Sequence, residues 1–178
     1  MRTLRIREIT MMGLSIALTT IGTMVIQIPI PATNGYIHVG DGILLIVAVT
    51  LGARAGFIAG GIGSALADIL TGYTIWAPFT LIIKGLMGYI MGRIASPSGE
   101  PSPLVTKRGL FGACLAAAWM VIGYYVSEAI LTSSLQVPIF AIPWNFIQGI
   151  GGIIIYTLVG SLLSKANIMR GERERKTN

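Results

Sequence analysis

The chain has 178 residues, of which 53% are hydrophobic and 11% charged, with a formal net charge of +6. A soluble domain carries roughly 25% charged residues, so this composition excludes an ordinary water-facing surface and indicates an integral membrane protein. At about 20 residues per membrane-spanning helix, six helices with short loops fill the length as one domain, residues 1–178. The single Cys114 excludes disulfide scaffolds and multi-cysteine metal sites.

Apolar runs between polar breaks predict an all-α protein with six transmembrane helices in one compact bundle. The second run is shorter than a bilayer crossing, so it is either a re-entrant segment or a helix extended by residues 36–40. A Ser- and Pro-rich stretch near residues 95–108 predicts a cytoplasmic linker between two three-helix halves. In chain order, the predicted spans are residues 9–28, 41–51, 55–72, 78–94, 109–132 and 141–164.

Every Lys and Arg except Lys84 falls on one side of this arrangement. The positive-inside rule places that side in the cytoplasm, so both termini and the basic tail at residues 165–178 are predicted to be cytoplasmic. The basic surplus is then a topology signal in a multi-pass plasma-membrane protein. Nucleic acid is not a predicted partner, because no basic face with interleaved aromatic residues and no binding motif occurs.

Ionisable and amide side chains gather in the outer half of the predicted bundle. Such groups cost about 2.5–3.5 kcal/mol each inside a membrane, so they normally face a cavity or one another. Their convergence from five helices predicts a water-accessible pocket that opens to the outside. The residues are Asp41, Asp68, Lys84, Glu128, Asn145 and Gln148.

The charged members of this set have structural alternatives. Lys84 either contacts a solute or pairs with Asp68 or Asp41 to neutralise charge between helices. Asp41 follows Gly40 at a helix start, where a carboxylate caps free N–H groups, so capping is favoured over contact with a solute. Asp41 and Asp68 are both assigned to structure or gating. Glu128 has no obvious cation besides Lys84, which favours contact with a solute.

The amides and aromatic residues suit a polar, flat ligand. Asn145 and Gln148 share a helix face, and amides supply both donors and acceptors. Aromatic residues at the same end form either an interfacial belt or a stacking wall for a ring. His38, the only histidine, is either a solvated loop residue or a solute contact. The aromatic candidates are Tyr36, Tyr73, Trp76, Tyr125 and Trp144, with Trp76 and Trp144 favoured for stacking.

Small residues repeat at helical spacing on the first predicted helix. Gly13 and Ala17 are four residues apart, and Ser15 and Thr19 extend them into a strip with little bulk. Such strips let helices approach closely in a membrane. The strip is predicted to receive another protein.

Motifs for the common enzyme chemistries are absent from the sequence. There is no Walker A pattern, no HExxH and no GxSxG, so neither ATP hydrolysis by this chain nor a protease or lipase activity is expected. The residues predict no metal site and no cofactor. A binding module for a small solute is favoured over an enzyme.

Several runs resemble the substrate-binding S components of energy-coupling factor (ECF) vitamin transporters, in the branch with riboflavin-, pyridoxine- and hydroxymethylpyrimidine-type members. They are residues 35–41 (GYIHVGD), 51–56 (LGARAG), 63–68 (GSALAD), 72–73 (GY), 77–78 (AP) and 83–88 (IKGLMG).

The resemblance implies a receptor that binds a vitamin or precursor from outside and docks to a transmembrane coupling protein with two cytoplasmic ATPases. It also implies that Gly13 and Ala17 correspond to the family's docking motif, with Gly in place of the usual first Ala. Glu128, Asn145 and Gln148 do not match the ligand residues of any single vitamin class in this family, so the resemblance does not identify the substrate. Two other classes remain as alternatives: a stand-alone secondary transporter or channel, and a membrane-embedded enzyme.

Overall fold

The computed structural model describes residues 6–30, 35–96 and 104–177, with side chains described up to residue 166. Six α-helices correspond to the six predicted spans, and a short β-hairpin that the sequence did not predict follows the first of them. The predicted linker lies partly outside the described residues, and the predicted tail continues the last helix. The elements are α1 (Ile6–Val25), β1 (Gln27–Pro29), β2 (Tyr36–His38), α2 (Gly40–Leu51), α3 (Ala53–Leu70), α4 (Ala77–Ala95), α5 (Lys107–Thr132), the 3₁₀ helix η1 (Val137–Ala141) and α6 (Ile142–Thr177).

Local sequence explains where several helices begin and end. Pro78 lies in the first turn of α4, where its missing N–H costs nothing. Thr106 caps α5, and its hydroxyl accepts a hydrogen bond from the Gly109 N–H at 2.9 Å. Gly52 has a φ of 86°, a left-handed conformation that glycine adopts without strain, and it alone separates α2 from α3.

The short second apolar run matches neither prediction, a re-entrant segment or a helix extended by residues 36–40. Residues 36–38 form a strand that pairs antiparallel with β1, and α2 begins only at Gly40. The 12 residues of α2 are about 18 Å long, well short of the hydrocarbon core of a bilayer. Strand and helix together therefore make up this segment of the bundle.

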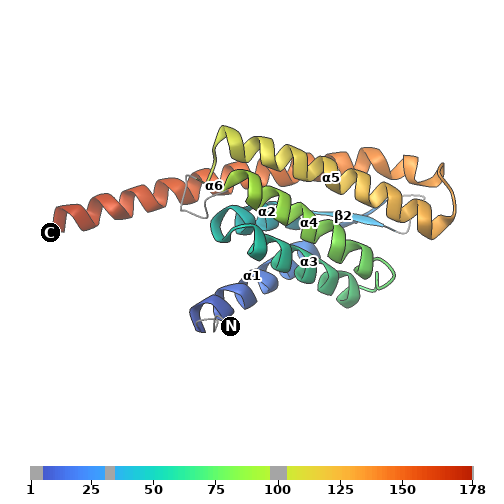
Figure 1. Cartoon of the computed structure of the whole chain (residues 1–178), viewed down its shortest axis with the longest axis horizontal. Helices are drawn as coiled ribbons and strands as arrows, with labels where there is room; N and C mark the ends of the chain where they lie inside the picture. Colours follow the sequence, from blue (N-terminus) through green and yellow to red (C-terminus); the bar gives the residue numbers. More distant parts are fainter. Residues whose placement is uncertain (1–5, 31–34, 97–103, 178) are drawn as a thin grey trace.

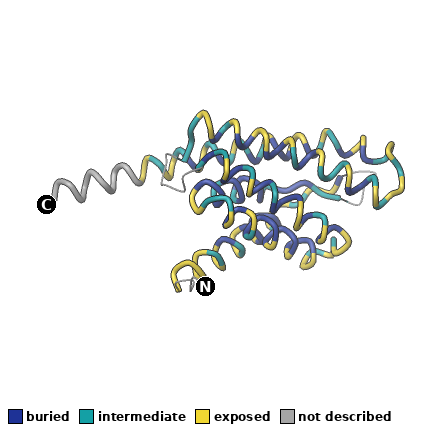
Figure 2. The backbone as a smooth tube through the Cα atoms, in the orientation of Figure 1, coloured by how far each residue is buried: buried dark blue, intermediate teal, exposed yellow. Residues whose placement is uncertain are grey.

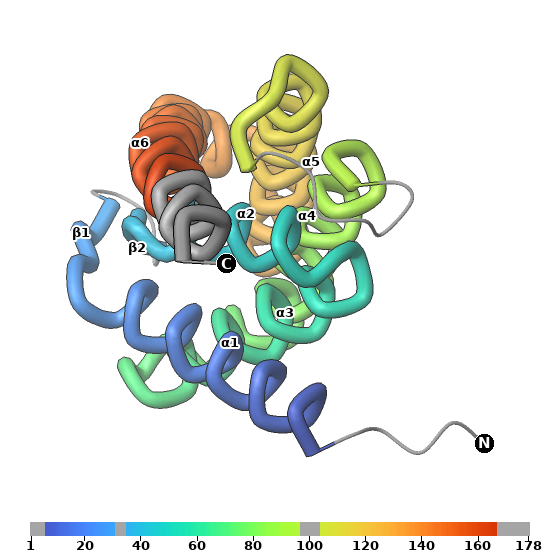
Figure 3. Tube along the Cα trace, turned by 90° about the vertical axis from the view of Figure 1, so that its left-hand side faces the viewer, coloured from blue at the N-terminus to red at the C-terminus, as the bar shows by residue number. Residues whose placement is uncertain are grey.

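The helices pack as a bundle with α2 in its interior (Figure 1). Helix α2 contacts α1, α3, α4 and α6. Seen end-on, α1 lies beside α3 on one side of the bundle, while α5 and α6 lie on the other (Figure 3). The hairpin, the start of α4 and the start of α6 share one end, which we call the hairpin end; α1 begins and α6 ends at the opposite end (Figure 1).

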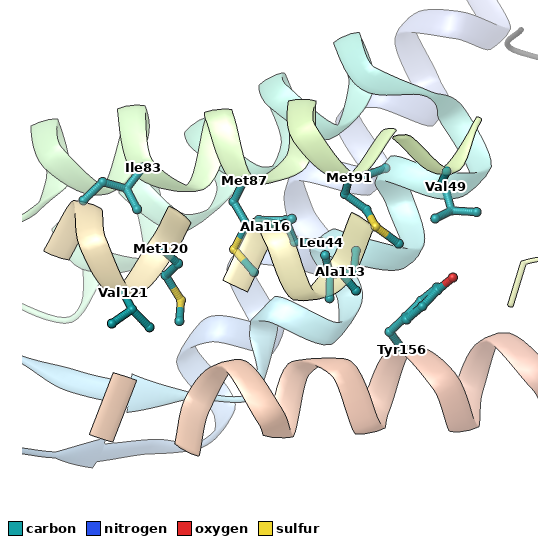
Figure 4. Close-up of a cluster of buried hydrophobic side chains, with 13 residues drawn as sticks. Leu44, Val49, Ile83, Met87, Met91, Ala113, Ala116, Met120, Val121 and Tyr156 are labelled. Carbon is teal, nitrogen blue, oxygen red and sulfur yellow. The ribbon is translucent and has the colours of Figure 1, made fainter. Parts of the chain in front are cut away.

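The apolar core lies between α2, α4, α5 and α6 (Figure 4). Met87, Met91 and Met120 are fully buried there with Leu44, and Tyr156 of α6 closes the cluster. Figure 2 shows buried positions where helices face one another and exposed positions along their outer sides.

Glycines allow α3 and α4 to pack backbone to backbone. A Cβ added at Gly56 would lie 2.6 Å from the carbonyl oxygen of Gly88, and one added at Gly88 would collide with the Gly56 backbone. The spacing of these small residues in the sequence therefore serves packing inside the bundle.

The outer surfaces of the helices are strongly apolar. Large hydrophobic side chains such as Ile82, Ile122 and Leu162 are more than half exposed. Within the described part of the chain, four helical segments are long and apolar enough to cross a membrane: Ile6–Val25, Ala53–Leu70, Lys107–Thr132 and Val137–Ala166. This surface fits a multi-pass membrane protein, because lipid and not water solvates it.

Helix α1 has two different faces. Ser15, Thr19 and Thr20 are buried, and the Thr20 hydroxyl donates a hydrogen bond to the Gly63 carbonyl of α3 at 2.9 Å. Gly13 and Ala17 are exposed on the other face. The predicted small-residue strip is therefore divided, since Ser15 and Thr19 face α3 while Gly13 and Ala17 face outward.

Candidate functional site

A small cavity of about 30 Å³ lies at the hairpin end. It has room for about one or two water molecules, so it is closed to any larger solute in this conformation. The hairpin, α4, α5, η1 and α6 all contribute to its wall. The lining residues are Ile30, Gly35, Tyr36, Trp76, Thr80, Tyr124, Glu128, Ala141 and Asn145.

Aromatic rings form much of this wall. Trp76 and Tyr124 meet edge to face with their ring centroids 6.1 Å apart. Tyr36 packs against Tyr73, which lies behind it, with centroids 4.4 Å apart. Aromatic surface with a few fixed polar groups is typical of small-molecule sites.

The polar groups of the wall come from four elements. Glu128 and Asn145 are buried, with 4% and 6% of their surface exposed. The hydroxyls of Thr80 and Tyr124 lie 3.3 Å apart and share a hydrogen bond. The Tyr36 hydroxyl donates to Asp68 Oδ1 at 2.6 Å. Burial and then the Asp68 charge raise the pKa of Tyr36, so its phenol stays protonated and remains a donor.

A second group of polar residues lies beside the cavity wall and does not line it. We call His38, Asp41, Lys84 and Gln148 the polar network. Lys84 Nζ donates to Asp41 Oδ1, and both side chains are fully buried. Gln148 Nε2 donates to Asp41 Oδ2 at 2.8 Å. The Asp41 carboxylate is thus satisfied at both oxygens, as a buried charge requires.

The network ties the hairpin to the helices. The backbone N–H of His38 donates to Gln148 Oε1 at 3.0 Å, so one amide side chain bridges β2 and the start of α2. The His38 ring is buried, and its Nδ1 accepts a hydrogen bond from the Gly40 N–H at 3.1 Å. Burial, followed by the positive charge of Lys84, lowers the pKa of His38 to about 3. His38 is therefore neutral in this conformation, and its burial contradicts the solvated-loop interpretation.

The structure separates the predicted site residues into four groups. Tyr36, Trp76, Glu128 and Asn145 line one cavity. His38, Lys84 and Gln148 belong to the polar network, in which Lys84 pairs with Asp41 and not with Asp68. The predicted capping role of Asp41 is wrong, because its oxygens accept from Lys84 and Gln148 and α2 has no side-chain cap. Tyr73 packs against the Tyr36 ring, and Asp68 accepts a hydrogen bond from the Tyr36 hydroxyl. Tyr125 and Trp144 are not among the lining residues, and the Tyr125 hydroxyl donates to the Leu135 carbonyl at 3.0 Å.

Five lining residues were not among the predicted site residues: Ile30, Gly35, Thr80, Tyr124 and Ala141. Helical spacing identifies the two hydroxyl-bearing ones, Thr80 and Tyr124. Tyr124 lies four residues before Glu128, so both residues lie on the cavity-facing side of α5. Tyr125 does not lie on that side. Thr80 lies four residues after Trp76 on the same face of α4. Ala141, the last residue of η1, lies four residues before Asn145 of α6, and both line the cavity, whereas Trp144 does not.

The whole-chain comparison decides the family. The sequence matches the family described as "ECF-type riboflavin transporter, S component" over residues 3–165. The chain belongs to this family. As an S component it is a membrane transport subunit of the vitamin and vitamin-precursor class and not an enzyme.

Relatives support this membership across nearly the whole chain. An uncharacterized protein of Pyrococcus woesei is 40% identical over 82% of this chain and 94% of its own length. A UPF0397 protein of Lactobacillus helveticus is 30% identical over 86% of this chain and 72% of its own. The thiamine precursor transporter HmpT of Lactococcus lactis is 26% identical over 95% of both chains.

Proposed function

We propose that this S component captures a water-soluble vitamin or precursor in the cavity at the hairpin end. A coupling protein and two cytoplasmic ATPases then drive its uptake. The observation that carries the proposal is the joint position of Glu128 and Asn145, both buried, among Trp76, Tyr124 and Tyr36. A flat heterocycle needs this combination of ring surface and fixed polar atoms.

Binding requires the hairpin to move, because about 30 Å³ does not hold a vitamin. Ile30, Gly35 and Tyr36 cover the cavity from the hairpin side. The loop proposed to close over the solute runs from Asn34 to His38, and Asn34 lies outside the described residues. In this proposal the described conformation is the closed form, with His38 held to Gln148.

The proposed orientation has six crossings and both termini in the cytoplasm. It is supported by the positive-inside pattern and by the position of the first and last helix ends on the same side of the bundle (Figure 1). The cavity then faces outward, as a receptor for external solute requires. The name of the Lactococcus relative favours a thiamine precursor as substrate.

Replacing Asn145 by Ala is expected to weaken solute binding by about 10-fold or more, because a buried amide that bonds the ligand contributes about 1–3 kcal/mol. The measurement is titration of the purified protein with riboflavin, thiamine, pyridoxine and hydroxymethyl-aminopyrimidine. Trp144→Phe is the control, since Trp144 neighbours Asn145 in the chain but does not line the cavity. Equal affinity in Asn145→Ala and wild type would contradict the site, and gradient-driven uptake by this chain alone in liposomes would favour stand-alone transport.

We further propose that the outward face of α1, marked by Gly13 and Ala17, docks to the coupling protein. Gly13→Leu is expected to abolish co-purification with that protein and to leave solute affinity unchanged. The fold tolerates the change, because nothing lies within 4 Å of a Cβ added at Gly13. Gly13→Ala keeps the position small and is expected to dock normally. Intact complexes with Gly13→Leu would contradict the docking face.

A further inference from the structure

We propose that the cavity at the hairpin end selects solutes that carry hydrogen-bond donors or a positive charge, and that it rejects anions. This inference rests on the proposed function and adds the chemical class of the solute. It follows from the charges, the donor inventory and the aromatic wall of the cavity.

The titratable carboxyl groups at the cavity are acids, and no lysine or arginine is among its described lining residues. Glu128 is the only ionisable carboxylate or cation among the lining residues, and its carboxylate has no ion-pair partner in the described part of the chain. Asp68 adds a second carboxylate directly behind Tyr36. An anionic solute would therefore find two acids and no cation in the described wall of the cavity.

The nearby cation does not offset this charge. Lys84 Nζ is fully buried, where it donates to Asp41 Oδ1 and to Met120 Sδ, the latter at 3.1 Å. Its ammonium is 5.4 Å from the centre of the Tyr124 ring, and Lys84 is not among the lining residues. To bind a carboxylate or phosphate, Lys84 would have to leave a satisfied ion pair in a buried site, which is costly.

The cavity also offers more acceptors than donors. Glu128 only accepts when ionised, and the donor of Tyr36 is already used by Asp68. Thr80 and Tyr124 use one hydroxyl hydrogen between them, which leaves one hydroxyl hydrogen as a donor. Asn145 alone presents an amide with both functions. A solute with amino or ring N–H groups satisfies this set, whereas a solute with only carbonyl and carboxylate oxygens leaves acceptors unpaired.

The aromatic wall also favours solutes that carry a positive charge. The faces of Trp76 and Tyr124 carry the negative side of the ring quadrupole, which attracts cations. A flat, protonated or amino-substituted ring stacks there and places its donor at Glu128. Charge, hydrogen bonding and stacking thus favour the same class of solute.

The test compares probes that share a ring and differ in charge. Pyridoxamine, pyridoxine and 4-pyridoxate form one series, and thiamine with thiamine pyrophosphate forms another. We expect the amine and the thiazolium cation to bind at least about 10-fold more tightly than their anionic counterparts, because a hydrogen bond to a charged group contributes about 1.5–3 kcal/mol. Glu128→Gln is expected to remove this preference by weakening the cationic probes while the anionic probes hold or gain affinity.

Glu8→Gln serves as the control, since it removes one carboxylate from α1, away from the cavity lining. Equal or tighter binding of the anionic probes, or an unchanged preference in Glu128→Gln, would overturn this inference and leave the proposed function intact. Failure of every probe to bind folded protein would overturn the proposed function, and this inference with it.

Discussion

Replacing Lys84 by Met is expected to destabilise the folded protein by about 3–5 kcal/mol, because it leaves the fully buried Asp41 carboxylate without its cation. Gln148 supplies one hydrogen bond at 2.8 Å, but a neutral amide does not neutralise the charge. The loss also reaches the hairpin, since Gln148 holds the His38 N–H and Asp41 at once. We expect a lower midpoint of thermal or denaturant-induced unfolding in detergent.

A double-mutant cycle separates the ion pair from simple loss of packing. Asp41→Asn and Lys84→Met are each expected to be destabilising, while the double variant loses less than the sum of the two, because no unpaired charge remains. Lys165→Met is the control, since Lys165 is exposed and its loss is expected to change stability by less than about 0.5 kcal/mol. Additive effects in the cycle would contradict an energetic coupling between Asp41 and Lys84.

The helices of this protein follow directly from the sequence, whereas the hairpin does not. Each apolar run between polar breaks became a helix, because lipid requires a segment to satisfy its own backbone hydrogen bonds. The strands Gln27–Pro29 and Tyr36–His38 have three residues each, too few for an alternating pattern to stand out. Their pairing depends on support from elsewhere in the chain, such as the Gln148 side chain that binds the His38 N–H.

The sequence also placed the candidate residues at one end of the bundle, where the structure brings them close together, but it did not distinguish the cavity wall from the polar network beside it. Buried polar residues in one depth band had to meet, so Glu128 and Asn145 were found from composition and position alone. Lys84 and Gln148 occupy the same band, yet their side chains turn toward Asp41. Helix rotation decides which residues face the cavity, and only the packed structure fixes it. Tyr125 and Trp144 were chosen over Tyr124 because the sequence does not give the rotation of each helix about its axis.

Replacing Gly88 by Ala is expected to destabilise the protein by about 1–3 kcal/mol, and Gly88→Val by more, because α3 and α4 must move apart. The added Cβ would collide with the Gly56 backbone, which has no flexible side-chain end that can shift. The reverse contact is equally close, since a Cβ at Gly56 would lie 2.6 Å from the Gly88 carbonyl oxygen. A side chain added at Gly56 is therefore expected to destabilise the protein in the same way as one added at Gly88.

The matched control is Gly151→Ala in α6, where nothing lies within 4 Å of the added Cβ. There the change is expected to be neutral or to stabilise by up to about 1 kcal/mol, since Ala favours a helix more than Gly does. Unfolding midpoints of the three proteins in the same detergent give the comparison. If Gly88→Ala were as stable as Gly151→Ala, α3 and α4 would not be in backbone contact. If Gly88→Ala alone unfolded early, that crossing would be a principal determinant of the bundle's stability.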